Sequence, residues 1–182
     1  MTDDNTMEQE KRNTSPTFAG VEGVKARQRQ QLEQFEQWAR DRDWRRFHDS
    51  HYDWWMFPMD RDSAGQGDRW TVYAGDVEAL KQDPEFVRDY LRGVELLMAS
   101  WGWNLKAQDY LPDPAADQRW QDHPVRLFKA ARSLKLFSFE REFESLKKYA
   151  QRLMEQGKSM TYGRHDLSWL FTTGIDPEVP RT

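Results

Sequence analysis

The chain contains no cysteine among its 182 residues. This absence excludes disulfide bonds, thiol catalysis and zinc sites built from thiolates, and it favours a reducing, cytoplasmic setting. Residues 1–16 lack the apolar stretch of a signal peptide. No apolar run approaches the about 18 residues that a membrane-spanning helix needs. We therefore expect a soluble cytoplasmic protein with no membrane partner.

The sequence also lacks the common catalytic motifs. It contains no phosphate-binding glycine loop, no nucleophile elbow and no His-Glu-x-x-His motif. The carboxylates follow the pattern of a solvated surface, so we assign none of them as a general acid or base. The formal net charge of -4 disfavours binding to nucleic acid, because such proteins normally carry a basic excess. We expect no catalytic residue, no cofactor and no metal ligand.

Aromatic residues are abundant instead. The chain has nine Trp, ten Phe and six Tyr, which is 14% of its residues, alongside 32% charged residues. This composition predicts a small, ring-rich core rather than a disordered chain. The rings are densest at residues 52–60, which read Tyr-Asp-Trp-Trp-Met-Phe-Pro-Met-Asp. This aromatic segment must be covered by the protein's own core or by a ligand.

Apolar residues recur at helical spacing along most of the chain, which predicts an all-α, compact bundle of about five to seven helices. Gly102 is placed to end one of these helices in the left-handed conformation, and another is predicted to end at Gly157. Pro84 and Pro124 mark helix starts. The predicted helices cover residues 24–47, with a break considered at 41–44, and residues 48–56, 76–81, 84–101, 125–136, 140–156 and 165–171. The polar run 60–71 is predicted to be a loop.

The domain organisation follows from the same pattern. Residues 1–17 are polar and have almost nothing to bury, so we predict a disordered N-terminal tail there. Residues 18–157 form one helical domain. Residues 158–182 form a C-terminal tail that contains one short amphipathic helix.

Four residues of the aromatic segment and its flank are candidate binding residues: His51, Tyr52, Trp54 and Trp55. The alternative interpretation is that the rings plug one end of the bundle. Adjacent residues on a helix point about 100° apart, so both indoles cannot be buried on one face. We therefore expect either Trp54 or Trp55 to be left for a partner.

A basic band is predicted on the helix that follows Pro124. Arg126, Lys129 and Arg132 step by three residues along it. One interpretation is internal pairing with Asp49 or Asp53 and a solvated face, which contributes little to stability. The other is a docking site for an acidic peptide, a carboxylate or a phosphate.

His48 and His51 are three residues apart, so on one helix both could face a metal ion. No third ligand with supporting spacing accompanies them, and His123 and His165 are isolated in the sequence. A metal-dependent enzyme that uses His48 and His51 is the alternative functional hypothesis. A further alternative is a self-assembling structural protein, because the amphipathic segments 24–47 and 165–171 could pair between copies and give a homo-oligomer.

Three separated segments resemble the N-terminal domain of the opioid growth factor receptor family. Residues 48–58 read His-Asp-Ser-His-Tyr-Asp-Trp-Trp-Met-Phe-Pro, close to that family's His-x-Tyr-x-x-Trp-Leu-Phe-Pro type of run. Residues 91–105 resemble its helix that ends in an aromatic-Gly turn. Residues 123–137 carry Arg126, Lys129 and Arg132 where the family has basic residues. The resemblance covers about residues 45–150, without the long polar repeats of the vertebrate members, and it implies an all-helical domain.

These observations together predict a non-catalytic ligand- or protein-binding helical module that resembles the opioid growth factor receptor domain. Its partner is predicted to be an acidic or aromatic peptide or protein segment. The predicted groove is lined by His51, Tyr52 and Trp55, and it is rimmed by Arg126, Lys129 and Arg132.

Overall fold

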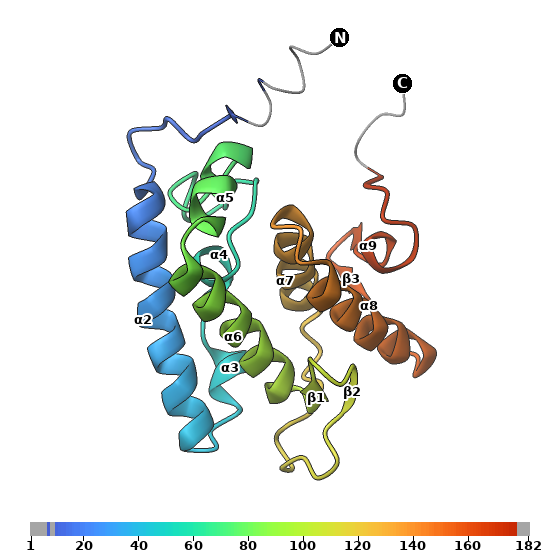
Figure 1. Cartoon of the computed structure of the whole chain (residues 1–182). Coiled ribbons are helices and arrows are strands. Elements are labelled where there is room, and N and C mark those ends of the chain that lie inside the picture. The colour runs from blue at the N-terminus through green and yellow to red at the C-terminus, as the bar shows by residue number, and fades with distance from the viewer. Residues whose placement is uncertain (1–6, 8–9, 178–182) are drawn as a thin grey trace. The chain divides into compact units, whose positions relative to one another are not determined.

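The computed structural model describes residue 7 and residues 10–177. This part of the chain is mostly helical, with eight helices and two small antiparallel sheets (Figure 1). It divides into two compact units. Unit 1 combines the chain up to Asp43 with Ser50–Leu96, and unit 2 combines Trp44–Asp49 with the chain from Leu97 onward.

Unit 1 contains α2 (Gly20–Arg40), α4 (Asp53–Met56), α5 (Ala74–Lys81) and the first thirteen residues of α6 (Pro84–Ser100). The long helix α2 packs against α4 and α5 (Figure 1). Although α2 is rich in polar residues, its inner side buries Val24 and Phe35 completely. Gln28 is also buried, and its side-chain amide donates to the Met56 carbonyl at 3.1 Å, which ties α2 to the end of α4.

The aromatic segment 52–60 supplies much of the apolar interior of unit 1. Tyr52, Met56 and Phe57 are all buried. The Tyr52 ring meets Phe35 edge-on at 4.7 Å between centroids, and Phe57 meets Tyr90 of α6 in the same way at 6.2 Å. Such edge-to-face pairs add to the free energy gained from burial of the rings. This agrees with the core-plug interpretation for these three residues.

Unit 2 contains α3 (Arg46–Asp49), the end of α6, the hairpin of β1 (Trp103–Asn104) and β2 (Asp109–Tyr110), α7 (Pro124–Leu136), α8 (Glu140–Glu155), the hairpin of β3 (Thr161–Tyr162) and β4 (His165–Asp166), and α9 (Trp169–Thr172). Helix α7 packs along α8, and both contact α9 (Figure 1). Trp103, fully buried, donates from its indole to the Ser145 hydroxyl at 3.0 Å. That hydroxyl donates to the Leu105 carbonyl at 2.8 Å, so both of these buried polar side chains are hydrogen-bonded.

Local sequence signals locate several helix ends correctly. Pro84 and Pro124 are the first residues of α6 and α7, as predicted. The Asp83 carboxylate accepts the Glu85 N–H at 3.0 Å and so caps the start of α6. Gly102 and Gly157 follow the ends of α6 and α8 with φ of 77° and 80°.

Three helix predictions need correction. The helix predicted for 24–47 ends at Arg40, at the break considered for residues 41–44, and Arg42 is in the left-handed region at φ 57°. The helix predicted for 48–56 is two short helices, α3 and α4, because Tyr52 leaves the helical region at φ -153° and ψ -4° and its ring is buried in the core. The segment 165–171 is not one helix, since residues 165 and 166 pair with 161 and 162 as a strand and only α9 follows.

The fold class is therefore mostly helical rather than all-α. The eight described helices exceed the predicted five to seven because three of them, α3, α4 and α9, have four residues each. The four strands have two residues each and close two tight hairpins. Patterns of hydrophobic spacing do not detect elements this short.

The predicted domain limits also differ from the structure. Residues 10–17, predicted to belong to a disordered tail, make defined hydrogen bonds to unit 1, whereas residues 1–6, 8 and 9 lie outside the described residues. Leu167 and Phe171 of the predicted C-terminal tail are buried, and α9 packs on α7 and α8. The predicted single domain 18–157 corresponds to parts of two compact units.

Across residues 7 and 10–177, no helix has both the length and the apolar character required to cross a membrane. This finding agrees with the expectation that the chain has no membrane-spanning helix.

Two glycines that end helices should differ in their cost of substitution. Both have positive φ, but a Cβ on Gly102 would lie 2.7 Å from the Gln118 carbonyl oxygen, whereas nothing lies within 4 Å of one on Gly157. Gly102→Ala should lower the free energy of unfolding by roughly 2–3 kcal/mol and Gly157→Ala by about 1 kcal/mol. Urea denaturation of both variants measures the difference, and equal losses would contradict the importance of the close approach.

Candidate functional site

The strongest candidate site in the described residues is built around His48 in unit 2. Its imidazole stands in a stack of three nearly parallel rings. The centroid of His123 lies 5.8 Å from that of His48 and the centroid of Trp101 lies 6.2 Å from it, each with an interplanar angle of 13°. His48 is only 7% exposed. Its two ring nitrogens are themselves buried, although the residue lines the hollow described below.

Helix α7 positions this stack. His123 immediately precedes Pro124, the first residue of α7, so the start of that helix sets the place of its ring. Arg126, one turn further on and 5% exposed, donates from one guanidinium nitrogen to the Phe47 carbonyl and, at 3.3 Å, to the His48 carbonyl. Charge-assisted hydrogen bonds of this kind are strong. Arg126 therefore holds the backbone of α3 against α7 and so places the His48 side chain.

Neither ring nitrogen of His48 has a hydrogen-bond partner among the described residues, although both are buried. Burial is the main cause that lowers the pKa of His48 to about 4, and the charges of His123 and Arg126 lower it further. A backbone hydrogen-bonding contribution from Ser100 and the charge of Asp49 oppose the shift. At neutral pH the ring is uncharged and presents one donor and one acceptor.

A hollow of about 560 Å³ opens beside this stack. Its lining carries two cationic and two anionic side chains, and Arg45 pairs with Asp49 at 3.2 Å in an exposed ion pair. Arg119 is exposed. The mixed charges suit a ligand that carries both a negative group and hydrogen-bond donors. The lining residues are Arg45, His48, Asp49, Ala116, Asp117, Arg119, Gln121 and His123.

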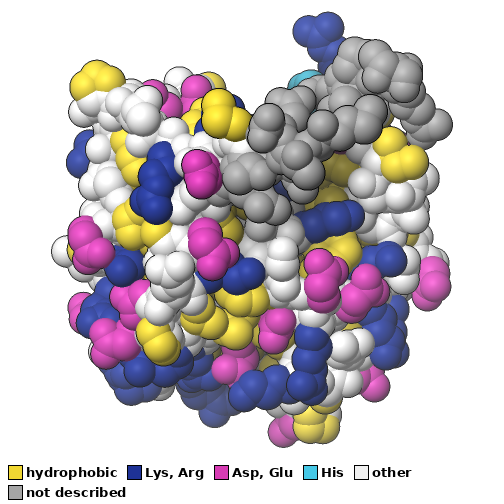
Figure 2. Space-filling model, turned by 45° about the horizontal axis from the view of Figure 1, so that its top comes forward, with side chains coloured by type: hydrophobic (Ala, Val, Ile, Leu, Met, Phe, Trp, Pro, Cys, Tyr) yellow, Lys and Arg dark blue, Asp and Glu magenta, His cyan; other side chains and the backbone are white. Residues whose placement is uncertain are grey.

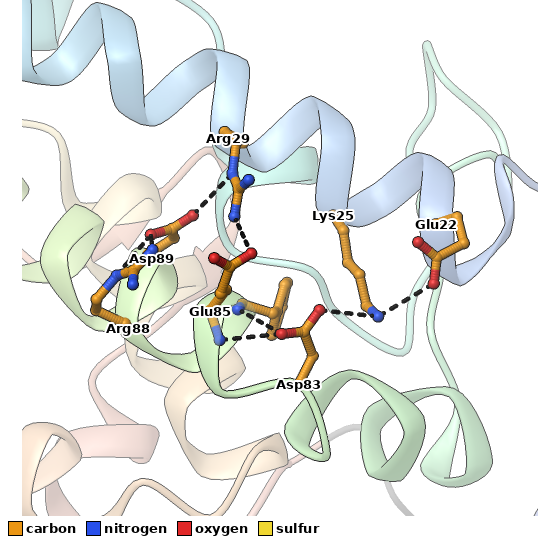
Figure 3. Close-up of polar contacts among 8 residues, drawn as sticks. Glu22, Lys25, Arg29, Asp83, Glu85, Arg88 and Asp89 are labelled. Atoms are coloured by element: carbon orange, nitrogen blue, oxygen red, sulfur yellow. Dashed lines mark hydrogen bonds and ion pairs between the residues drawn. The ribbon is translucent and has the colours of Figure 1, made fainter.

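A second hollow, of about 310 Å³, lies in unit 1 between α2 and the start of α6. Figure 3 shows that its charged side chains point at one another. Lys25 reaches Asp83 at 3.0 Å, and Arg29 reaches both Glu85 at 3.0 Å and Asp89 at 3.2 Å. These pairs join the two helices. Because its charges satisfy each other, this hollow offers a ligand less than the hollow of unit 2.

The candidates from the aromatic segment all belong to unit 1. His51 is exposed, whereas Tyr52 is fully packed in the core. Trp54 and Trp55 are both half-buried. The Trp55 indole donates to the Gln31 side chain at 3.0 Å. Neither indole is buried completely, so the structure leaves part of each accessible.

The candidates from the basic band belong to unit 2. Arg126 is buried and bonded to backbone carbonyls, so it does not form the rim of a groove. Arg132 is half-buried and pairs with Asp176 at 3.5 Å. Lys129 is also half-buried. The six residues of the predicted groove are thus divided between the two units, three in each.

The structure also bears on the two alternative hypotheses, a metal site at His48 and His51 and self-assembly through amphipathic segments. Helix α3 ends at Asp49, so His48 and His51 do not share one helical face as the metal hypothesis requires. No group of three potential metal-ligating side chains occurs in the described part of the chain. In the two segments considered for self-assembly, Phe35 and Phe171 are fully buried, whereas Leu32, Trp38 and Trp169 are half-buried.

Sequence analysis missed most of the residues around the hollow. His123 appeared isolated because its neighbour in space, His48, is far away in the chain. Asp117 and Arg119 lie in the irregular connector before α7, where no periodic pattern exists. Only the His-Pro pair at the start of α7 gave a local signal, because it placed His123 at a defined helix start.

Figure 2 shows a face of the molecule on which Lys and Arg side chains are interspersed with Asp and Glu, with apolar side chains between them. The charge mixture around the hollow is thus similar to that of the general surface. The feature that distinguishes the hollow is the buried imidazole on its wall.

The lowered pKa of His48 predicts a pH-dependent stability. The unfolded chain binds more protons than the folded one between the folded pKa of about 4 and the ordinary value of 6.5, so stability falls as pH is lowered through this range. The loss should be roughly 3 kcal/mol. His48→Phe keeps an aromatic ring in the stack and should remove this dependence in urea denaturation, whereas the exposed control His165→Phe should retain it. An unchanged slope in His48→Phe would contradict the assignment.

Comparisons with protein-family models, with curated proteins and with solved structures find no significant match to this chain. The site is therefore interpreted from its own geometry.

Proposed function

We propose that the chain is a non-catalytic binding module of the opioid growth factor receptor type, with its ligand site in the hollow of unit 2. The proposed ligand is an acidic or aromatic peptide segment. The lack of cysteine supports a reducing compartment such as the cytoplasm. The family resemblance supports the module type, and the side chains around His48 support the position of the site.

The observation that carries the proposal is the unpartnered edge of His48. A buried polar group without a hydrogen bond costs about 1–3 kcal/mol. Such groups are uncommon in folded proteins, and each asks for an explanation. Here both nitrogens of one ring are unpartnered at the wall of an open hollow. A ligand group that reached one of these nitrogens, as donor or as acceptor, would recover part of that cost on binding.

The charges of the hollow match a peptide as well. Arg119 is exposed, and Arg45 would exchange its exposed pair with Asp49 for a ligand carboxylate, which guanidinium groups bind with two parallel hydrogen bonds. Asp117 and Gln121 can accept backbone N–H groups. Ligand pockets commonly span about 300–1,000 Å³, and this hollow lies inside that range. It has room for a short segment of a peptide.

The geometry favours binding over catalysis. A histidine that acts as a general base normally has a second group that orients its ring through a hydrogen bond. His48 has no such partner among the described residues. Its pKa of about 4 is also well below the neutral range that suits a general base at physiological pH.

An array of acidic and aromatic peptides tests this function. The full chain should bind a subset of them, and Arg45→Ala combined with Arg119→Ala should weaken that binding at least about tenfold, because two cations of the hollow are lost. The matched control is Arg141→Ala with Arg164→Ala, which removes two exposed arginines of unit 2 outside the hollow. The control should bind like the unmodified chain.

The variant His48→Phe distinguishes the role of the stacked ring from the role of its two nitrogens. It should keep the far-UV circular dichroism spectrum of the parent while losing peptide binding, because phenylalanine stacks but cannot form the hydrogen bonds of the imidazole. Binding retained in both the double-arginine variant and His48→Phe would refute the hollow as the site. If no acidic or aromatic peptide binds the unmodified chain, the proposed ligand class is refuted.

A further inference from the structure

Residues 10–17, which we call the arm, lie along unit 1 in a way that resembles a bound peptide. The arm contacts a surface formed by the loop that ends at Tyr73 and by the first turn of α5, which we call the arm groove. The Gly75 N–H at the start of α5 donates to the Lys11 carbonyl at 2.8 Å. The Lys11 ammonium lies over the Tyr73 ring, 4.2 Å from its centroid.

Almost all of the polar atoms of Asn13 form hydrogen bonds. Its backbone N–H donates to the Asp76 carboxylate at 2.8 Å. Its side-chain amide donates twice, to the Asp68 and Thr71 carbonyls, each at 2.9 Å. The amide oxygen accepts the Ser15 N–H at 3.0 Å. No other side chain of similar size supplies two donors and an acceptor in this arrangement except glutamine, which is one carbon longer.

Two of the residues that contact the arm, Thr71 and Asp76, are buried beneath it and are held by further hydrogen bonds within unit 1. Asp76 is 2% exposed, and its carboxylate also accepts the Tyr73 N–H at 3.0 Å, which holds it in place at the start of α5. Thr71 is 2% exposed. The arm continues beyond Asn13 with a hydrogen bond from the Thr17 hydroxyl to the Asp68 carboxylate. Several points of recognition thus follow one another along the arm.

Gly75 makes the close approach of the arm possible. A Cβ at this position would lie 2.8 Å from the Glu10 carbonyl oxygen, 2.9 Å from Arg12 Cγ and 3.0 Å from the Lys11 carbonyl oxygen. All three atoms belong to the arm. Any side chain at Gly75 would therefore exclude the arm, while alanine is itself a good helix former in α5.

From these contacts we infer that the arm groove is a recognition site for a Lys-x-Asn-x-Ser segment, and that a second copy of this chain supplies that segment when the chain's own arm is displaced. The arm precedes α2 and makes its contacts with residues 68–76. The same contacts form whether the arm comes from the same chain or from another. Exchange of an identical element is a low-cost route to association between copies. This site lies in unit 1 and does not depend on the function proposed for unit 2.

A labelled peptide of residues 10–18 tests the groove directly. In the unmodified chain the tethered arm competes at a high effective concentration, so the peptide should bind weakly. In the full-length variant Asn13→Asp the arm loses two donors and gains a charge beside Asp76, so the groove should open. Fluorescence anisotropy should show the peptide binding this variant at least about tenfold more tightly than the unmodified chain.

Two controls define specificity. The same peptide with Asp in place of Asn should bind Asn13→Asp at least about tenfold more weakly, because a carboxylate cannot donate to the Asp68 and Thr71 carbonyls. The double variant Asn13→Asp, Gly75→Ala should not bind either peptide. If Asn13→Asp loses its helical circular dichroism signal, Asn13→Ala opens the groove without an added charge. Failure of the peptide to bind a folded open-groove variant, or equal binding of the Asp peptide, would overturn the inference.

A pair of complementary variants then tests exchange between whole chains. Gly75→Ala keeps an intact arm but blocks its own groove, whereas Asn13→Asp keeps an open groove but has a defective arm. Labelled Gly75→Ala should bind Asn13→Asp, and the unlabelled peptide should compete with it. The control mixes labelled Gly75→Ala with unlabelled Gly75→Ala, in which every arm groove is blocked. This mixture should show no binding that the unlabelled peptide inhibits. Absence of peptide-sensitive binding in the complementary pair would refute the second copy as the source of the segment.

Discussion

The interaction on which the candidate site depends is the contact between the Arg126 guanidinium and the backbone of α3. Helix α3 has only four residues, too few to be stable by itself. Its last carbonyls would lack partners in such a short helix. Arg126 supplies donors to the Phe47 and His48 carbonyls from a helix that begins 75 residues later in the chain. The stack of His48 with His123 and Trp101 follows from this contact.

The two units use charge in opposite ways. In unit 1 the cations of α2 meet the carboxylates at the start of α6, and the hollow between them is occupied by its own ion pairs. In unit 2 Arg45, Asp49 and Arg119 at the hollow are exposed, and the nitrogens of the His48 imidazole are among the buried polar atoms that lack hydrogen-bond partners. Exposed ion pairs contribute little to stability, whereas unpartnered buried groups reduce it. The second arrangement is therefore the one that a ligand would improve.

The arm illustrates how polar residues become ordered without a hydrophobic core. Its composition suggests disorder, because it has almost no apolar side chain to bury. Asn13 nevertheless engages Asp68, Thr71 and Asp76 through directed hydrogen bonds. Gly75 allows the backbones to approach closely enough for them to form. The composition of a segment indicates how much apolar surface it can bury. It does not show hydrogen-bond partners of this kind elsewhere in the chain.

The sequence by itself determined the features that depend on neighbouring residues. Pro84, Pro124 and Gly102 marked helix ends correctly because backbone conformation at these residues is set locally. The sequence could not show that Arg126 would be buried, since a basic residue at regular spacing looks the same on a solvated face. It also could not bring His48 beside His123. Only the tertiary structure decided these contacts, because each joins segments that lie far apart in the chain, 79 residues for Arg126 and Phe47.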